Sequence, residues 1–278
     1  MRSFIFGDRV TEFARSPRIW NALYREFDLK ESMTPIDANL KTIHDVVSKA
    51  SSTNAKVCGL IAAPLKDHTI WFNSYTTETA RMARAANYFE CENGEINFVT
   101  NFDGKAATQS ILNHIPEAKS TLKHVSIIGT GPVARIIAAE LKNLLEIDAK
   151  FIFFTRKLTE LNSKSGMSNL SNIYPLEFFE FQTRMTDLVI NCSPIGSPRL
   201  PGTPITKSQI YALGSNASYF DVNYGQETPL GVQTCLRMGR IAFDGAEMNR
   251  LQAALAFLFA TKLNYDLNEL VGKIENIP

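Results

Sequence analysis

The sequence predicts an α/β protein that combines a doubly wound, parallel β-sheet domain with a second α/β domain. Strand-like and helix-like segments alternate along the whole chain, which is the pattern of a parallel sheet covered by helices. Near the middle, a glycine-rich turn lies directly between a β-rich run and an amphipathic segment. The length of 278 residues suggests about two domains.

Composition excludes several classes of function. The apolar fraction of 45% and the charged fraction of 21% are those of an ordinary globular protein. The net charge of +1, without a basic run, predicts that neither nucleic acid nor an anionic membrane is a partner. No apolar run approaches the roughly 18 residues of a membrane span, and the first residues are expected to form a strand rather than a signal peptide.

The cysteines and histidines are scattered along the chain. They have neither the spacing of a metal site nor that of a disulfide framework. We therefore expect no metal ion, and a protein of the reducing cytoplasm. The residues concerned are Cys58, Cys91, Cys192, Cys235, His44, His68, His114 and His124.

In the first half of the chain, helices are expected where apolar residues repeat at helical spacing and strands where they gather in short runs. Ser16 is expected to be a helix N-cap, with Pro17 at the first helical position. The turn Glu92-Asn-Gly94 separates the two arms of a hairpin. The expected elements are a strand at 3–6, helices at 16–27 and 38–50, a strand at 56–61, a hairpin of 86–91 and 95–99, and a helix at 105–113.

In the second half the alternation becomes regular, as in βαβ units. Segment 159–171 is rich in Ser, Asn and Lys and is expected to be a loop or a frayed helix. The other expected elements are a strand at 124–128, a helix from the glycine-rich turn to about 145, strands at 150–154, 187–191 and 219–222, and helices at 246–263 and 267–274.

The segment Gly129-Thr-Gly131-Pro-Val-Ala134 fits Gly-x-Gly-x-x-Ala, the loop that binds dinucleotides in Rossmann-type sheets. The glycines permit a tight turn and let backbone N–H groups approach a pyrophosphate, and the small alanine lets the helix pack on its strand. The alternative is an ordinary strand–helix turn that binds nothing. The flanking strand and amphipathic helix favour a dinucleotide. The cofactor-binding residues expected here are Gly129, Gly131, Pro132, Val133 and Ala134.

The end of the next strand indicates which dinucleotide binds. An NAD site carries an acidic residue there for the ribose hydroxyls. The strand at 150–154 instead continues into Thr155, Arg156 and Lys157. An arginine suits a 2′-phosphate because its planar guanidinium bonds phosphate oxygens in pairs. Although a solvated strand end can have the same composition, these residues favour NADP.

Seven segments, in order, resemble motifs of the shikimate dehydrogenase family along nearly the whole chain. Each segment is short, and the resemblance rests on the segments occurring in the same order as the motifs of the family. They are Ala14-Arg-Ser-Pro-Arg-Ile-Trp-Asn21, the Pro-x-Lys of Pro64 and Lys66, Ala85-Ala-Asn87, Asn101-Phe-Asp-Gly104, Asn191-Cys-Ser-Pro-Ile-Gly196, Asp221-Val-Asn-Tyr224 with Thr228-Pro-Leu230, and Asp244-Gly-x-x-Met248 with Gln252.

The resemblance implies an enzyme of aromatic amino acid biosynthesis, a monomer or homodimer, whose partner is a small-molecule substrate. The substrate-binding domain would consist of 1–106 and 245–278, and the NADP-binding domain of 107–244 would be inserted between these two parts of the chain. The active site would lie in the interdomain cleft. The implied catalytic residues are Lys66 and Asp103. The implied substrate-binding residues are Ser16, Asn87, Tyr224 and Gln252, and the further cofactor-binding residues are Asn191, Ser193 and Gly245.

Lys66 and Asp103 also make chemical sense as a pair. Hydride transfer between a secondary alcohol and a nicotinamide requires a group that takes up or returns the hydroxyl proton. Burial lowers the pKa of a lysine and a nearby carboxylate raises it, and the sequence leaves that balance open. Taken alone, Lys66 is better explained as a solvated loop lysine and Asp103 as a helix N-cap. The series of motifs favours the catalytic role.

Several matched positions depart from the family pattern. Ala14 and Ala62 lack hydroxyl groups that the family places against its substrate. A polar pocket discriminates strongly through such groups, so their loss predicts a less polar relative of shikimate as substrate. Ser16 with Arg15 or Arg18 can still hold a carboxylate. The remaining departures are Trp20, Leu60, Tyr88 and Phe102.

Three alternatives remain beside a shikimate dehydrogenase. A quinate or other hydroxy-acid dehydrogenase can use the same scaffold. A regulatory dinucleotide-binding module without turnover is disfavoured by the retained Lys66 and Asp103, because a sensor needs no proton path. An enzyme of the methylene-folate type explains neither the Asn101–Gly104 match nor the match that begins at Asp244.

Overall fold

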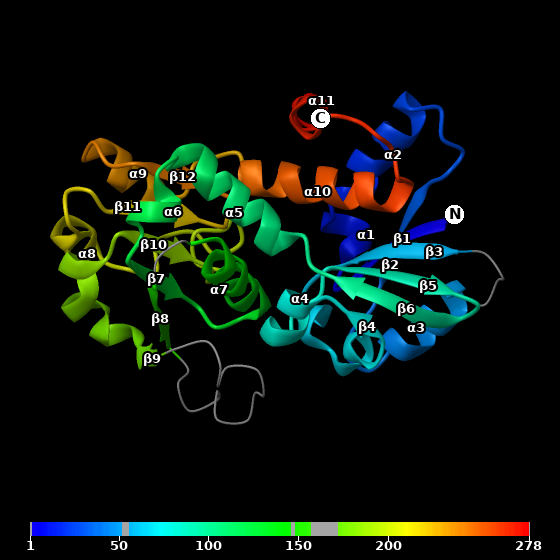
Figure 1. The fold of residues 1–278 in the computed structure, drawn as a ribbon, viewed down its shortest axis with the longest axis horizontal. Helices are drawn as coiled ribbons and strands as arrows, with labels where there is room; N and C mark the ends of the chain where they lie inside the picture. Colours follow the sequence, from blue (N-terminus) through cyan, green and yellow to red (C-terminus); the bar gives the residue numbers. More distant parts are fainter. Residues whose placement is uncertain (1, 52–55, 146–147, 157–171, 278) are drawn as a thin grey trace. The chain divides into compact units, whose positions relative to one another are not determined.

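The computed structural model describes residues 2–51, 56–145, 148–156 and 172–277. The chain divides into two compact units, unit 1 (Met1–Asp103 and Arg250–Pro278) and unit 2 (Gly104–Asn249). Each unit has its own six-stranded sheet, so the predicted α/β class is confirmed (Figure 1). The finer domain boundaries expected from the sequence stay a prediction. Among the described residues, helices are too short or too polar to cross a membrane.

The sheet of unit 1 is mixed. Its strand order is β2-β1-β3-β5-β6-β4, and β5 runs antiparallel to both β3 and β6. The strands are β1 (Arg2–Gly7), β2 (Met33–Asp37), β3 (Val57–Ile61), β4 (Tyr75–Thr76), β5 (Tyr88–Glu92) and β6 (Glu95–Thr100). Around them lie α1 (Val10–Phe13), α2 (Ser16–Glu26), α3 (Ile43–Ser51), η1 (Leu65–Asp67), η2 (Thr69–Asn73), α4 (Glu78–Ala83) and α11 (Leu267–Glu275).

Both faces of this sheet are buried. Side chains alternate between faces along β1, so Phe4 and Phe6 belong to one apolar cluster and Ile5 to another. The Phe4–Phe6 face packs against α3 and Trp71. The Ile5 face packs against α2, α11 and α10 (Ala246–Thr261), with the buried Phe257 of α10 among the aromatic rings there.

Unit 2 contains the predicted Rossmann-type sheet. All its strands are parallel, in the order β12-β11-β10-β7-β8-β9. From β9 inward this is the third, second, first, fourth, fifth and sixth strand of the unit, the order of a doubly wound dinucleotide-binding sheet. The strands are β7 (His124–Ile128), β8 (Lys150–Thr155), β9 (Asn172–Pro175), β10 (Leu188–Asn191), β11 (Ser218–Asp221) and β12 (Ala242–Asp244).

Most helices of unit 2 lie in the connections between these strands, and the first two precede β7 along the chain (Figure 1). The chain order reverses between β7 and β10, and ligands bind such sheets at the carboxyl ends of the strands beside that point. The helices are α5 (Asp103–His114), α6 (Ala118–Thr121), α7 (Pro132–Leu144), η4 (Leu176–Met185), α8 (Lys207–Ala212) and α9 (Leu230–Arg237).

Two expected helix starts are wrong. Ser16 is not the N-cap of α2, because Arg15 occupies that position and already has helical dihedrals, φ −80° and ψ −28°. The helix expected at 38–50 begins only at Ile43. The Asn39 side chain accepts hydrogen bonds from the N–H groups of Lys41 and Thr42, which favours a turn over a helix before that point. Segment 159–171 lies outside the described residues.

Candidate active site

The glycine-rich loop between β7 and α7 has the geometry of an anion-binding turn. Gly129 has a φ of +110°, and a side chain there would meet the main chain of Cys192 at 3.1 Å. Gly131, by contrast, has extended dihedrals, and a Cβ atom on it would meet no described atom within 4 Å. Gly131 is also the N-cap of α7, so it offers no capping side chain to the first-turn N–H groups. A phosphate can therefore approach the helix start closely.

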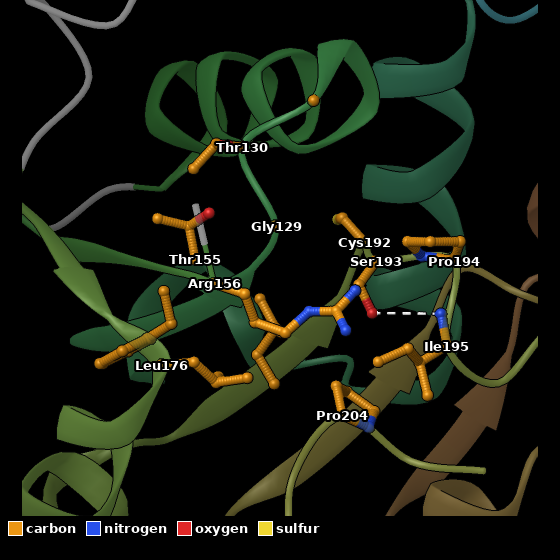
Figure 2. A pocket seen from close by; sticks show the side chains of 13 residues that line it. Gly129, Thr130, Thr155, Arg156, Leu176, Cys192, Ser193, Pro194, Ile195 and Pro204 are labelled. Atoms are coloured by element: carbon orange, nitrogen blue, oxygen red, sulfur yellow. Dashed lines mark hydrogen bonds between the residues drawn. The ribbon is translucent and has the colours of Figure 1, made fainter. Parts of the chain in front are cut away.

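A pocket of about 210 Å³ opens beside this loop (Figure 2). Figure 2 shows the Arg156 side chain extending from the end of β8 into the pocket, with Ser193 and Pro194 on the other side. Most of the lining comes from the carboxyl ends of β7, β8 and β10, which are neighbours in the sheet, and from the turns that follow them. It consists of Ile128, Gly129, Thr130, Gly131, Phe154, Thr155, Arg156, Leu176, Cys192, Ser193, Pro194, Ile195 and Pro204.

The structure brings five of the expected cofactor-binding residues together in this lining, namely Gly129, Gly131, Thr155, Arg156 and Ser193. Five others lie outside it, namely Pro132, Val133, Ala134, Asn191 and Gly245. Lys157 lies outside the described residues. Of the five outside the lining, Gly245 has the clearest packing role, since a Cβ atom there would lie 2.1 Å from the Val222 carbonyl oxygen.

In unit 1, Lys66 and Asp103 form an ion pair. The Lys66 Nζ donates to Asp103 Oδ2 at 2.6 Å, and the two side chains are 18% and 8% exposed. Lys66 lies in η1, directly after β3, and Asp103 begins α5. The buried Leu65 fixes this turn, because its carbonyl accepts a hydrogen bond from the Trp71 indole at 2.8 Å. A lysine that follows a buried strand is thus held against a carboxylate.

Two buried asparagines connect the segments around this pair. The Asn87 Oδ1 accepts from the Phe102 N–H at 2.7 Å. The Asn101 Oδ1 accepts from the Asp103 N–H at 2.8 Å, and its amide donates to the Ala85 carbonyl. Lys66 joins the same network through its own carbonyl, which accepts from the Ala86 N–H at 2.7 Å. The positions of Lys66 and Asp103 are therefore coupled through the main chain as well as through the ion pair.

The other expected substrate-binding residues are distributed over both units. Ser16, half-buried at the start of α2, and Gln252, 9% exposed in α10, belong to unit 1, as does Asn87. Tyr224, half-buried after β11, belongs to unit 2.

Most departures from the family pattern lie in the hydrophobic core of unit 1. Leu60, Tyr88 and Phe102 belong to one buried cluster, and the Tyr88 and Phe102 rings meet edge to face at 5.4 Å. The Tyr88 hydroxyl is occupied within the core, where it donates to Glu90 at 3.0 Å. Trp20 is fully buried in the same cluster. Of the departures, Ala14 and Ala62 alone are partly exposed.

Sequence reasoning missed eight lining residues, namely Ile128, Thr130, Phe154, Leu176, Cys192, Pro194, Ile195 and Pro204. Thr130 and the residues of 192–195 lie inside quoted motifs, so the motifs located them without assigning them a role. Leu176 and Pro204 come from segments without a motif. Within the described residues, no three His, Cys, Asp or Glu side chains gather as a metal site.

Known proteins of one family resemble this chain. The shikimate dehydrogenase (NADP(+)) of Leptospira interrogans serogroup Icterohaemorrhagiae serovar Lai (strain 56601) is 25% identical over 268 residues, which cover 94% of this chain and 90% of that protein. No family model matches the chain.

Two solved structures show the same fold. The shikimate 5-dehydrogenase of Thermus thermophilus, in complex with NADP(H) and shikimate, has a TM-score of 0.79 at 18% identity, covering 100% of both chains. A quinate dehydrogenase from Corynebacterium glutamicum, in complex with NAD, has a TM-score of 0.81 at 19% identity, covering 99% of this chain and 98% of that one.

Proposed function

We propose that the chain is a member of the shikimate dehydrogenase family, an NADP-dependent oxidoreductase that interconverts a cyclic hydroxy acid and its ketone. The hydroxy acid is shikimate, with 3-dehydroshikimate as the ketone, or a less polar analogue. The observation that carries this proposal is the contact of 2.6 Å between Lys66 and Asp103, because it provides the proton-transfer group that the chemistry needs.

The pocket of unit 2 fits the dinucleotide. Gly131 leaves open space in front of the N-terminus of α7, where the first-turn N–H groups can bind the pyrophosphate. Arg156 and Thr155 at the end of β8 would hold the 2′-phosphate, by a paired guanidinium contact and a hydroxyl hydrogen bond. When bound, the cofactor supplies or accepts the hydride.

Lys66 and Asp103 would move the proton. In reduction, the Lys66 ammonium donates a proton to the ketone oxygen, and in oxidation its amine takes the proton back from the hydroxyl. Asp103 orients the ammonium through the hydrogen bond of 2.6 Å and stabilises its charge. The low exposure of both side chains strengthens that interaction.

The departures from the family pattern bear on whether the substrate is shikimate or a less polar analogue. The apolar side chains of Leu60, Tyr88 and Phe102 are used in core packing, so they need not signal a changed pocket. Ala14 and Ala62 are partly exposed, and their methyl side chains offer no hydroxyl to a polar substrate. The cofactor and the acid would be the small-molecule partners of a cytoplasmic monomer or homodimer.

The test of this function is the reduction of NADP, followed at 340 nm, with shikimate and with quinate as alternative substrates. We expect turnover with shikimate or with an analogue that lacks one ring hydroxyl. Turnover with quinate but not with shikimate would identify the protein as a quinate dehydrogenase. NADPH binding without turnover on any of these acids would contradict the proposed reaction and favour a regulatory module.

Replacing Arg156 with alanine is expected to weaken NADPH binding by about 10- to 100-fold, because a charge-assisted pair contributes about 1.5–3 kcal/mol. NADH binding should stay within about threefold, since NADH lacks the 2′-phosphate. Titration of nicotinamide fluorescence measures both affinities. Arg237→Ala, which removes an exposed arginine of α9 outside the pocket lining, is the charge-matched control. Equal losses of NADPH and NADH affinity would contradict the assignment.

A further inference from the structure

A carboxylate that does not line the cofactor pocket lies beneath one of its walls. Asp221, at the end of β11, is 0% exposed. Its Oδ2 accepts from Asn191 Nδ2 at 2.9 Å and lies 3.4 Å from the Tyr219 hydroxyl. Its Oδ1 accepts from the N–H and the side-chain amide of Asn223, at 3.0 and 2.8 Å. All these donors are neutral groups.

Asn191 connects Asp221 to Ser193 and Ile195 in one wall of the pocket. Its Nδ2 donates to the Ile195 carbonyl at 2.7 Å as well as to Asp221. Its Oδ1 accepts from the N–H and the hydroxyl of Ser193, at 3.0 and 2.7 Å. A side-chain amide has two donor hydrogens and two acceptor lone pairs, so these four bonds use its full capacity.

Asn223 holds the same wall from the other side. Its Nδ2 donates to the Ser193 carbonyl at 2.8 Å while it bonds Asp221. Gly196, which ends this stretch, has a φ of +111°, and a Cβ atom on it would lie 3.0 Å from Asp221 Oδ2. The main chain of 193–196 is therefore hydrogen-bonded to both asparagines and closely packed over the carboxylate.

Asn191 and Asn223 each donate a side-chain hydrogen bond to residue 221, so both side-chain oxygens of that residue must act as acceptors. An ionised carboxylate accepts through both oxygens. An amide at this position would accept on one side only, and its NH₂ group would face either Asn191 Nδ2 or the donors of Asn223. If Asn191 turned its amide over to recover a bond, it would lose its bonds to Ser193 and Ile195. Only the carboxylate satisfies both amides at once.

We propose that Asp221 is a positioning residue, which sets residues 192–195 against the cofactor through Asn191 and Asn223. Those four residues line the pocket, whereas Asp221 does not. The inference rests on the proposed function for the identity of the bound molecule. The positioning itself depends on the hydrogen bonds alone.

The titration of Asp221 agrees with this role. Burial raises the pKa of Asp221 to about 6, against the opposing hydrogen bonds from Asn191, Asn223 and Tyr219. Below that pKa one oxygen carries a proton and no longer accepts, so the wall should loosen as the pH falls. The other titratable groups here are Cys192 and Tyr219, whose pKa values burial raises, and Asp244, the register partner of Asp221 on β12.

The first test is amide hydrogen exchange of the full chain, without ligand, for the parent and Asp221→Asn. Exchange in the peptide that covers 192–196 should be about tenfold faster in the variant, while β7 and β8 stay protected. Unchanged exchange in 192–196 would overturn the proposal, whether or not the protein binds a nucleotide. Faster exchange in the variant of a protein that binds no NADPH would instead refute the proposed function and leave the positioning role standing.

The second test is NADPH affinity by nicotinamide fluorescence at pH 7.5 and 5.5. At pH 7.5, Asp221→Asn should bind about tenfold more weakly than the parent. On acidification the parent should lose several-fold more affinity than the variant. The 2′-phosphate also titrates near pH 6, but it does so equally for both proteins. Equal affinity of both proteins at pH 7.5, or parallel pH profiles, would overturn the proposal.

Two further variants separate positioning from loss of folding. Ser126→Ala removes a buried hydroxyl of β7 that bonds Thr186 rather than Asp221 or the 192–195 wall, and it should leave NADPH affinity within about twofold. If Asp221→Asn does not fold, Asn223→Ala replaces it, because Asn223 is half-buried and bonds the Ser193 carbonyl directly. Asn223→Ala should raise both the exchange rate and the NADPH dissociation constant, and no change in either would overturn the proposal.

Discussion

Replacing Lys66 with alanine is expected to lower kcat for the hydroxy acid by a factor of about 10²–10⁴, the usual contribution of a positioned acid–base group. The reason is the geometry of the pair, in which the Lys66 Nζ lies 2.6 Å from Asp103 Oδ2 and both side chains are largely buried. NADPH affinity should be unchanged, because Lys66 is absent from the lining of the unit 2 pocket proposed to hold the cofactor. Steady-state kinetics at saturating NADP measure the effect.

The matched control is Lys56→Ala. Lys56 contacts Glu90 at 3.0 Å in the same unit and is 43% exposed, so its replacement removes a similar ion pair away from the candidate residues. Asp103→Asn keeps the shape of the second partner and should also lower kcat, by less than Lys66→Ala if lysine carries the proton. A kcat for Lys66→Ala within threefold of the parent would contradict the catalytic role.

Replacing Phe257 with alanine is expected to lower the free energy of unfolding of unit 1 by about 3–5 kcal/mol. Phe257 is fully buried in α10, and its ring meets those of Trp20 and Tyr24 at 5.4 and 5.2 Å. Its removal leaves a cavity and also breaks aromatic contacts, which contribute beyond buried area.

Tryptophan fluorescence during urea unfolding measures this loss selectively. The two tryptophans of the chain, Trp20 and Trp71, both belong to unit 1, so the signal reports that unit even if unit 2 unfolds separately. Phe13→Ala is the control, because Phe13 is 47% exposed and should cost less than about 1 kcal/mol. A loss for Phe257→Ala no larger than that of Phe13→Ala would show that the aromatic cluster does not stabilise the unit.

The parts of the fold that the sequence predicted well are those with a local signal. The loop at 129–134 is predictable because a tight turn, the close approach of a pyrophosphate and a helix start each restrict which residue types can occupy neighbouring positions. The central strands were located because strands buried on both faces form continuous apolar runs, as in Val125 and Ile127 of β7. The ion pair of Lys66 and Asp103 spans 37 positions, and the family resemblance rather than any local pattern suggested it.

The four strands that were not predicted, β2, β4, β9 and β12, are the outermost strands of the two described sheets. An edge strand pairs on one side only and carries fewer buried side chains, so its apolar pattern is weak. Both β2 and β9 also contain a proline, Pro35 and Pro175, which edge strands tolerate and central strands do not. Leu176 and Pro204 reach the pocket through tertiary packing, which leaves no periodic signal in the sequence.

The discontinuous make-up of unit 1 has a consequence for the order of events during synthesis. Unit 2 is one continuous stretch, so all of its strands have been made before the ribosome reaches residue 250. Unit 1 at that stage lacks α11 and nearly all of α10, whose Phe257, Leu270 and Ile274 cover the apolar face of α2 and β1. Domains fold as units during translation, and unfinished ones expose apolar surface. The first-made part of the chain is thus expected to complete its core last, and a chain terminated before residue 250 should aggregate through that uncovered face.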